Sequence, residues 1–145
     1  MSSETLPGFP LNRSQQVMLC AAALGVIIGF AVGRSVEPDP RGYGTHQQFG
    51  LPPCTFQTVF GIPCPSCGGT TSVALFTRGE WMKSFLANPA VFTGSLMAVL
   101  FVPWAGISSW KRRLLGVSKP SLTCLLLMSA VCAIALGQWA VRLLA

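Results

Sequence analysis

Two cysteines three positions apart give this chain its clearest chemical feature. They lie in FGIPCPSCGGTTSVALF, residues 60–76, between prolines and glycines and just ahead of residues that favour a helix. A third cysteine, Cys54, precedes Cys64 and Cys67 in the same segment. Thiols at such spacing can form a disulfide, bind a metal ion or act as a redox pair. The sequence leaves these chemistries open.

A structural disulfide is the first interpretation, with Cys54 joined to Cys64 or Cys67. The surrounding segment is rich in proline and glycine and poor in core-forming residues. A disulfide that closes such a loop typically stabilises a protein by about 2–4 kcal/mol. The interpretation requires the loop to lie outside the cytoplasm, where disulfides form and persist.

A metal site is the second interpretation. A two-residue gap lets the thiolates of Cys64 and Cys67 reach one tetrahedral ion, and a closed structural site has four ligands. Cys54 and His46 would complete a shell of three cysteines and one histidine, with zinc as the expected ion. His46 stands beside two glutamines and outside any paired ligand motif, so it also fits a solvated loop residue.

A redox-active pair is the third interpretation. At the start of a helix, exposed backbone N–H groups and the helix dipole stabilise a thiolate and lower its pKa. Cys64 would attack, and Cys67 or Cys54 would resolve the intermediate. The chain lacks the alternation of strands and helices typical of thioredoxin-like proteins, and no pattern marks an electron acceptor. Unpaired cysteines packed at a membrane interface are a fourth interpretation.

The residues after the second cysteine suit a turn that enters a helix. Gly68 and Gly69 allow close backbone approach, and the hydroxyl of Thr70 or Thr71 can cap the helix. A glycine-rich turn of this kind can also hold an anion such as a lipid phosphate, with charge supplied by Arg78. Ordinary capping is the preferred interpretation.

The composition places these residues in a membrane protein. The chain has 145 residues, 51% hydrophobic and 10% charged, which is too apolar for an ordinary soluble domain. We predict an all-α integral membrane protein with three transmembrane helices and a cysteine loop leading into one or two short interfacial helices. The predicted segments are a flexible tail (1–16), transmembrane helices (17–33, 89–110 and 121–142), the cysteine loop (34–88) and a basic linker (111–120).

The apolar runs carry several local signals. Asn88-Pro89 reads as an N-cap followed by proline at the first helical position, which predicts the start of the second span. The first run could be a secretory signal, but its uncharged length favours an uncleaved anchor. Three further cysteines lie in apolar runs and are expected to be inert small hydrophobes: Cys20, Cys124 and Cys132.

Gly25, Gly29 and Gly33 recur at four-residue spacing in the first run. Such spacing places side-chain-free positions on one helix face and lets another helix approach closely. Packing against the other two spans is the preferred interpretation, and formation of a homo-oligomer through this face is the alternative.

The positions of the basic residues predict how the protein is oriented in the membrane. The net charge is +6, but the basic residues flank apolar runs, so nucleic acid is not an expected partner. The two faces carry equal numbers of basic residues, but those of the 111–119 linker are the most concentrated. The positive-inside rule then puts the linker in the cytoplasm and the cysteine loop outside a bacterial inner membrane.

A combination of short motifs runs through roughly residues 50–110: Cys54, residues 61–70, Arg78-Gly79-Glu80 and Asn88-Pro89. This combination resembles the family of small bacterial membrane proteins called domain of unknown function 2752 (DUF2752). The family pattern is similar to G-x-P-C-P-x-C-G-x-T-R, followed by an N-P pair. Thr71 stands where the family usually has arginine, and Arg78 is a candidate to replace it. The resemblance implies a bacterial membrane protein with a cysteine loop, without an activity.

These observations favour a non-enzymatic membrane module whose stapled cysteine loop binds a partner protein or a lipid. The alternatives are a membrane thiol–disulfide oxidoreductase that uses Cys64 and Cys67, and a structural metal site that includes Cys54. The sequence leaves the cofactor unknown, with no cofactor and zinc as the alternatives considered.

Overall fold

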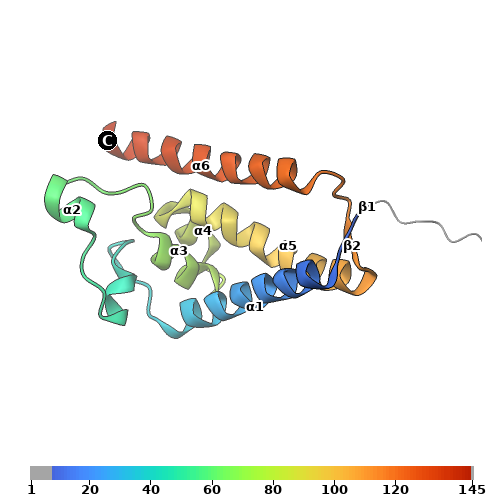
Figure 1. The fold of residues 1–145 in the computed structure, drawn as a ribbon. Helices are drawn as coiled ribbons and strands as arrows, with labels where there is room; N and C mark the ends of the chain where they lie inside the picture. Colours follow the sequence, from blue (N-terminus) through green and yellow to red (C-terminus); the bar gives the residue numbers. More distant parts are fainter. Residues whose placement is uncertain (1–7, 145) are drawn as a thin grey trace, which may run out of the picture.

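Three long helices form the frame of the protein. A computed structural model describes residues 8–144, and its long helices are α1 (Arg13–Ser35), α5 (Pro89–Lys111) and α6 (Pro120–Leu144) (Figure 1). Each is long and apolar enough to cross a membrane. Helix α5 contacts both α1 and α6. The predicted fold class, an all-α membrane protein with three spanning helices, is confirmed.

Four short elements fill the cysteine loop between α1 and α5. They are the 3-10 helix η1 (Thr45–Phe49) and the helices α2 (Thr55–Phe60), α3 (Gly69–Phe76) and α4 (Trp81–Ala87). The predicted short helices after the cysteines correspond to α3 and α4, whereas η1 and α2 were not predicted. Helix α3 packs on α1, α4 and α5, and it contributes buried residues Ala74, Leu75 and Phe76 to the core.

Helix α1 begins at Arg13, earlier than the apolar run that marks the predicted first span. Asn12 caps it: its Oδ1 accepts from Gln15 N at 2.8 Å, while Gln15 Oε1 accepts from Asn12 N at 2.9 Å. This capping box satisfies two backbone donors at the helix start. Of the predicted flexible tail, residues 1–7 lie outside the described residues, and Gly8–Pro10 form a strand.

A two-stranded sheet joins the N-terminal segment to the linker. Strand β1 (Gly8–Pro10) pairs antiparallel with β2 (Arg113–Leu115), with Phe9 opposite Leu114. The sheet lies at the end of the bundle away from the cysteine loop, whereas the C-terminus of α6 lies at the loop end (Figure 1). Three consecutive spans require this arrangement, because each crossing takes the chain to the opposite end.

The start of α5 follows the predicted signal. Asn88 is the N-cap, its Oδ1 accepts from Val91 N at 3.0 Å, and Pro89 takes the first helical position. Helix α5 then continues through Pro103 to Lys111. The predicted helix start is therefore confirmed.

The glycine stripe of α1 makes one close contact. A Cβ added at Gly33 would come within 2.6 Å of Val73 Cγ1, which belongs to α3. At Gly25 and Gly29 nothing lies within 4 Å of such an atom. The close approach at Gly33 is thus to a short loop helix rather than to another span.

Candidate functional site

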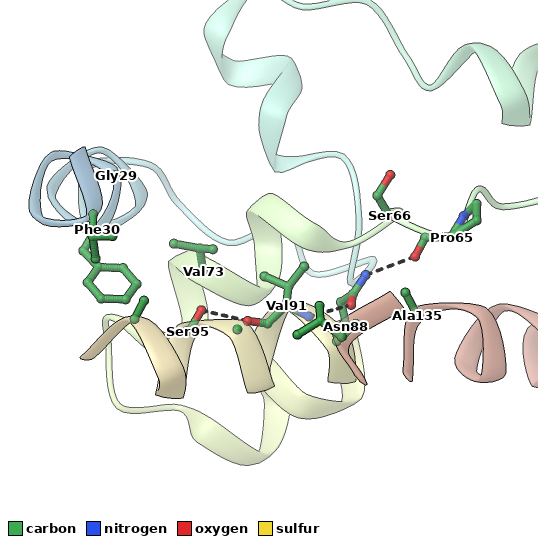
Figure 2. Close-up of a pocket in the computed structure, with 14 residues that line it drawn as sticks. Gly29, Phe30, Pro65, Ser66, Val73, Asn88, Val91, Ser95 and Ala135 are labelled. Atoms are coloured by element: carbon green, nitrogen blue, oxygen red, sulfur yellow. Dashed lines mark hydrogen bonds between the residues drawn. The ribbon is translucent and has the colours of Figure 1, made fainter. Parts of the chain in front are cut away.

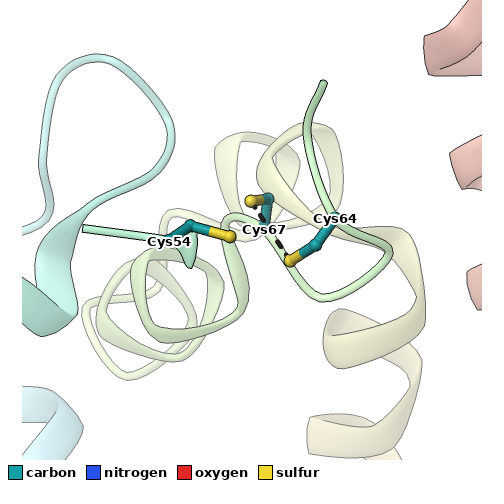
Figure 3. A group of neighbouring side chains, drawn as sticks. All are labelled: Cys54, Cys64 and Cys67. Atoms are coloured by element: carbon teal, nitrogen blue, oxygen red, sulfur yellow. Dashed lines mark hydrogen bonds between the residues drawn. The ribbon is translucent and has the colours of Figure 1, made fainter. Parts of the chain in front are cut away.

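Three cysteine sulfurs converge at the start of α3 (Figure 3). Cys54 precedes α2, whereas Cys64 and Cys67 lie in the turn that enters α3. The three Sγ atoms all lie within 4.8 Å of one another, and those of Cys64 and Cys67 are 3.3 Å apart. Two separate chain segments therefore supply one cluster of thiols.

The predicted disulfide between Cys54 and Cys64 or Cys67 is absent from this structure. All six cysteines of the chain are free. The 3.3 Å between the Sγ atoms of Cys64 and Cys67 is well beyond a sulfur–sulfur bond of about 2.05 Å. Instead of a covalent bridge, backbone and side-chain hydrogen bonds hold the cysteine turn. The prediction of a loop stapled by a disulfide is therefore wrong for this structure.

Local hydrogen bonds shape the turn itself. Cys67 N donates to Cys64 O at 3.1 Å, and Gly69 N donates to Ser66 O at 3.0 Å. Asn88, which is 1% exposed, donates from Nδ2 to Cys67 O at 3.1 Å while its Oδ1 caps α5. One amide side chain thus fixes the cysteine turn against the start of a spanning helix.

Helix α6 anchors the turn from the other side. Trp139 Nε1 donates to Pro63 O at 2.7 Å, and Arg142 Nη1 donates to Cys67 O at 3.0 Å. Arg142 Nη2 also donates to Ala87 O, at the end of α4. Sequence reasoning missed both residues because they lie far along the chain from the cysteines. An arginine in an apolar run was the available signal, since such residues usually have a partner.

The residue that caps α3 is a glycine, whereas the sequence predicted a cap from a threonine hydroxyl. Gly68 is the N-cap of α3 with φ 84°, and no side chain caps this helix. A Cβ at Gly68 would also come within 2.5 Å of Ala87 O, so the position requires glycine on both counts. Thr71 is fully buried and shares a 2.8 Å hydrogen bond with Thr45 Oγ1, which fixes η1 to α3.

The cysteines face a cavity of about 390 Å³ that is also lined by His46, Gln57 and Thr70. His46 Nε2 lies 3.2 Å from Pro52 O. Among residues 8–144, the potential metal ligands that gather within 4.8 Å of one another are the three cysteines alone. His46 lines the same cavity but does not belong to this cluster. The structure therefore brings three of the four predicted ligands together.

The two turn cysteines have opposite pKa shifts. Partial burial raises the pKa of Cys64, but hydrogen bonds from Ser66, Cys67 and Cys54 outweigh it and bring the value to about 7. Burial, followed by the hydrogen bond with Cys64, raises the pKa of Cys67 to about 12. Ser66 Oγ lies 3.4 Å from Cys64 Sγ. Cys64 is thus the thiol that ionises first, and thiolates are the nucleophilic form.

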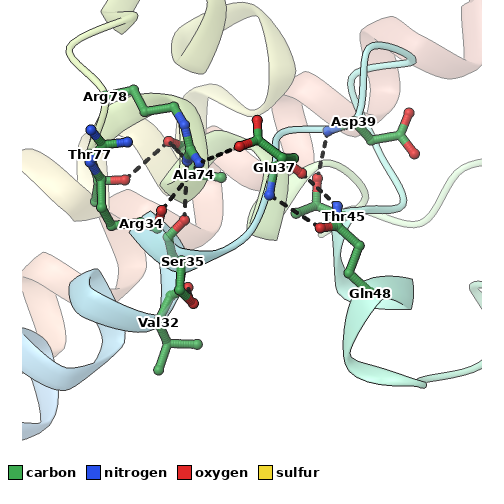
Figure 4. Close-up of polar contacts among 11 residues, drawn as sticks. Val32, Arg34, Ser35, Glu37, Asp39, Thr45, Gln48, Ala74, Thr77 and Arg78 are labelled. Carbon is green, nitrogen blue, oxygen red and sulfur yellow. Dashed lines mark hydrogen bonds and ion pairs between the residues drawn. The ribbon is translucent and has the colours of Figure 1, made fainter.

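Arg78, the candidate replacement for the family arginine, lies in a separate polar cluster (Figure 4). Its guanidinium donates to Ala74 O at 3.0 Å and to Arg34 O at 3.2 Å, and it lies 3.6 Å from Glu37 Oε1. These contacts join the C-terminal ends of α1 and α3. Arg78 thus ties the loop to α1, and it is not among the residues that line the cysteine cavity.

Comparison with known proteins identifies one family. Residues 54–102 match the family described as "Protein of unknown function (DUF2752)". Comparisons with curated proteins and with solved structures found no match. The matched range begins at Cys54, includes Cys64 and Cys67, and ends within α5. The segment that holds all three site cysteines therefore matches the DUF2752 family, which supports the resemblance seen in the sequence.

Proposed function

We propose that this membrane protein exchanges thiols with disulfides through Cys64 and Cys67. The observation that carries the proposal is the 3.3 Å separation of two free sulfurs in a C-x-x-C turn that faces a cavity. The low pKa of Cys64 supports its role as the attacking residue. The buried Cys67, with its raised pKa, suits the resolving role.

The exchange proceeds in two balanced steps. The Cys64 thiolate attacks one sulfur of a partner disulfide, forms a mixed disulfide and releases the other partner sulfur as a thiolate, which takes a proton from water. Cys67 then loses its proton to water and attacks Cys64 Sγ. This step releases the second partner thiol and forms the Cys64–Cys67 disulfide. The partner gains two electrons and the protein loses two, and the reverse reaction oxidises a partner dithiol.

The release of the Cys67 proton follows from the first step. Its pKa is raised by burial and by the hydrogen bond with Cys64. Once Cys64 is bound in a mixed disulfide, it no longer carries a negative charge. The contribution of the Cys64 thiolate to the raised pKa of Cys67 is then removed. The pKa of Cys67 then falls, and the second attack becomes possible.

The proposed setting is a bacterial inner membrane with the cysteine loop on the extracytoplasmic side. The dense basic linker after α5 favours this orientation under the positive-inside rule. A membrane-impermeant maleimide applied to intact cells tests it. Labelling of Cys64 before lysis supports the orientation, and labelling only after lysis contradicts it.

Serine variants test the exchange itself. We expect Cys67→Ser to accumulate a mixed disulfide with glutathione when the reduced, chelator-treated protein in detergent is mixed with oxidised glutathione, because the resolving thiol is missing. Cys64→Ser should form no such adduct at this turn. Cys132→Ser is the matched control, since Cys132 is an exposed cysteine of α6 outside the site. Peptide mass mapping locates the adduct.

Two results would contradict the proposal. One is an equal yield of adduct on the turn in wild type and Cys67→Ser, since resolution would then not involve Cys67. The other is the absence of any adduct on Cys64 in the Cys67→Ser variant, provided that its circular dichroism matches that of the wild type.

A second candidate keeps the non-enzymatic role, with a lipid as the ligand. An apolar groove of about 600 Å³ supports it, with one end formed by Pro65 and Ser66 of the cysteine turn (Figure 2). Residues from all three spans line it, among them Val26, Phe30, Val91 and Val131. We expect Gly94→Leu, which fills the groove, to reduce the lipid that copurifies in native mass spectrometry. Unchanged lipid would reject this role.

A further inference from the structure

The geometry points to a second use of the same cluster: we propose that the reduced protein binds a thiophilic divalent cation, Zn²⁺, through the sulfurs of Cys54, Cys64 and Cys67. The proposal goes beyond thiol exchange and does not rest on it, because exchange needs only Cys64 and Cys67. Cys54 is the residue that distinguishes the two.

The spacing of the sulfurs fits one ion. In a tetrahedral site with Zn–S bonds of about 2.3 Å, neighbouring sulfurs lie ~3.8 Å apart. Here Cys64 and Cys67 are 3.3 Å apart, and all three sulfurs lie within 4.8 Å of one another. Cys54 approaches the other two from its own segment (Figure 3). The three separations therefore lie within about 1 Å of the tetrahedral value.

The surroundings suit an ion with one exchangeable position. Cys67 is buried, while Cys54 and Cys64 are half-buried and border the cavity of about 390 Å³. That cavity leaves room for water as the fourth ligand, the arrangement of an open zinc site. Thiolate ligands select thiophilic ions over Mg²⁺ and Ca²⁺, which prefer oxygen. Binding replaces the thiol protons and offsets the repulsion among three neighbouring thiolates.

The ion supplies a stronger link than the thiol hydrogen bonds between Cys54 and the turn. Cys54 stands directly before α2, and this helix contributes no buried residue to the core. A bond from Cys54 to an ion shared with the turn before α3 fixes the start of α2 to the rest of the loop. The cross-link expected from the sequence as a disulfide is thus made by a metal.

Metal binding and exchange exclude each other. A Cys64–Cys67 disulfide removes two of the three ligands, because a metal ligand must be a thiolate. Oxidation therefore releases the ion, and a bound ion occupies the attacking sulfur. The chelator-treated protein is consequently the form in which exchange is measured.

Cobalt serves as the spectroscopic probe of the site. The full chain, purified in detergent, reduced and stripped with a chelator, is titrated with Co²⁺ and then with Zn²⁺. We expect one ion per chain, thiolate-to-cobalt charge-transfer absorption in the near ultraviolet, and loss of that absorption as Zn²⁺ displaces Co²⁺. No charge-transfer absorption in the reduced wild type would overturn the proposal.

Cys54→Ser separates the two uses of the cluster. Loss of an outer-shell partner lowers metal affinity by about 10–100-fold, so loss of a ligand should weaken Zn²⁺ binding by about 100-fold or more. The same variant should still form a Cys64–Cys67 disulfide. Cys132→Ser should bind Zn²⁺ like the wild type. Wild-type affinity in Cys54→Ser would reject the three-sulfur site and leave thiol exchange untouched.

A measurement without substitutions covers the case in which Cys54→Ser fails to fold. Wild-type protein oxidised with diamide, which takes the two electrons and two protons of the dithiol, should bind no Co²⁺ at the site. Reduction of the same sample should restore binding. Equal charge-transfer absorption in the oxidised and reduced samples would contradict the assignment.

Discussion

At the scale of single residues, position within one turn gives Cys64 and Cys67 different chemistry. Cys64 is half-buried and receives hydrogen bonds from Ser66, Cys67 and Cys54, so its thiolate is stabilised. Cys67 is buried, and burial disfavours its charged form. Two cysteines of one turn therefore differ in how readily they ionise, as the proposed exchange requires of an attacking and a resolving thiol.

This difference predicts the pH dependence of alkylation. The pKa of Cys64 is lowered from 9.0 to about 7, so its iodoacetamide rate in chelator-treated protein should rise with a midpoint near pH 7. The sign follows because the thiolate reacts and the thiol does not. Ser66→Ala removes one stabilising hydrogen bond and should move the midpoint upward. A wild-type midpoint near 9, or one that Ser66→Ala leaves unchanged, would contradict the assignment.

At the scale of elements, a glycine of α1 lets α3 pack closely against it, beside the stacked rings of Phe30 and Phe76. Gly33 is buried, and Val73 of α3 occupies the space where a side chain would begin. Val73 is β-branched, so it cannot easily turn aside. The contact positions α3, and with it the cysteine turn, against a spanning helix.

Gly33→Ala should therefore destabilise the protein. The added Cβ would lie 2.6 Å from Val73 Cγ1, and overpacking of this kind typically costs about 1–3 kcal/mol. Gly25→Ala is the matched control on the same face, because nothing lies within 4 Å of its added atom. Unfolding in mixed detergents measures the stability of both variants. Equal stability of the two variants would show that α3 does not pack closely on α1.

Helix α6 is joined to the cysteine turn by polar side chains near its C-terminus. With its amide oriented to satisfy both neighbours, Gln138 donates to Asn88 Oδ1 and accepts from Arg142 Nη2, each at 3.1 Å. Arg142 in turn donates to the carbonyls of Cys67 and Ala87. The turn, the start of α5 and the end of α6 thus share one hydrogen-bond network.

Arg142→Met should loosen this network. Hydrogen bonds from a charged donor contribute about 1.5–3 kcal/mol, so we expect a loss of stability in that range and faster maleimide labelling of Cys67. Lys119→Met makes the same change of charge at an exposed linker position and should alter neither. Wild-type labelling of Cys67 in Arg142→Met would show that α6 does not hold the turn.

At the scale of the whole molecule, the spans could be predicted because the length of an apolar run directly reports a bilayer crossing. Strands β1 and β2 could not, since Phe9 and Leu114 pair only after the spans have brought distant segments together. The two-residue spacing predicted that Cys64 and Cys67 act as a pair. Cys54 was a third candidate for the site because it lies in the same loop. The anchors Trp139 and Arg142 were missed because only the folded chain brings α6 to the turn.

The central claim is that Cys64 and Cys67 cycle between dithiol and disulfide. It is tested most directly by equilibrating the chelator-treated wild type with glutathione buffers of increasing oxidising strength, followed by intact-mass and peptide-linkage analysis. The account predicts a reversible loss of two hydrogens and a peptide that contains the Cys64–Cys67 bond. No reversible loss at any buffer composition, or a bond that joins Cys54 to either cysteine, would contradict it.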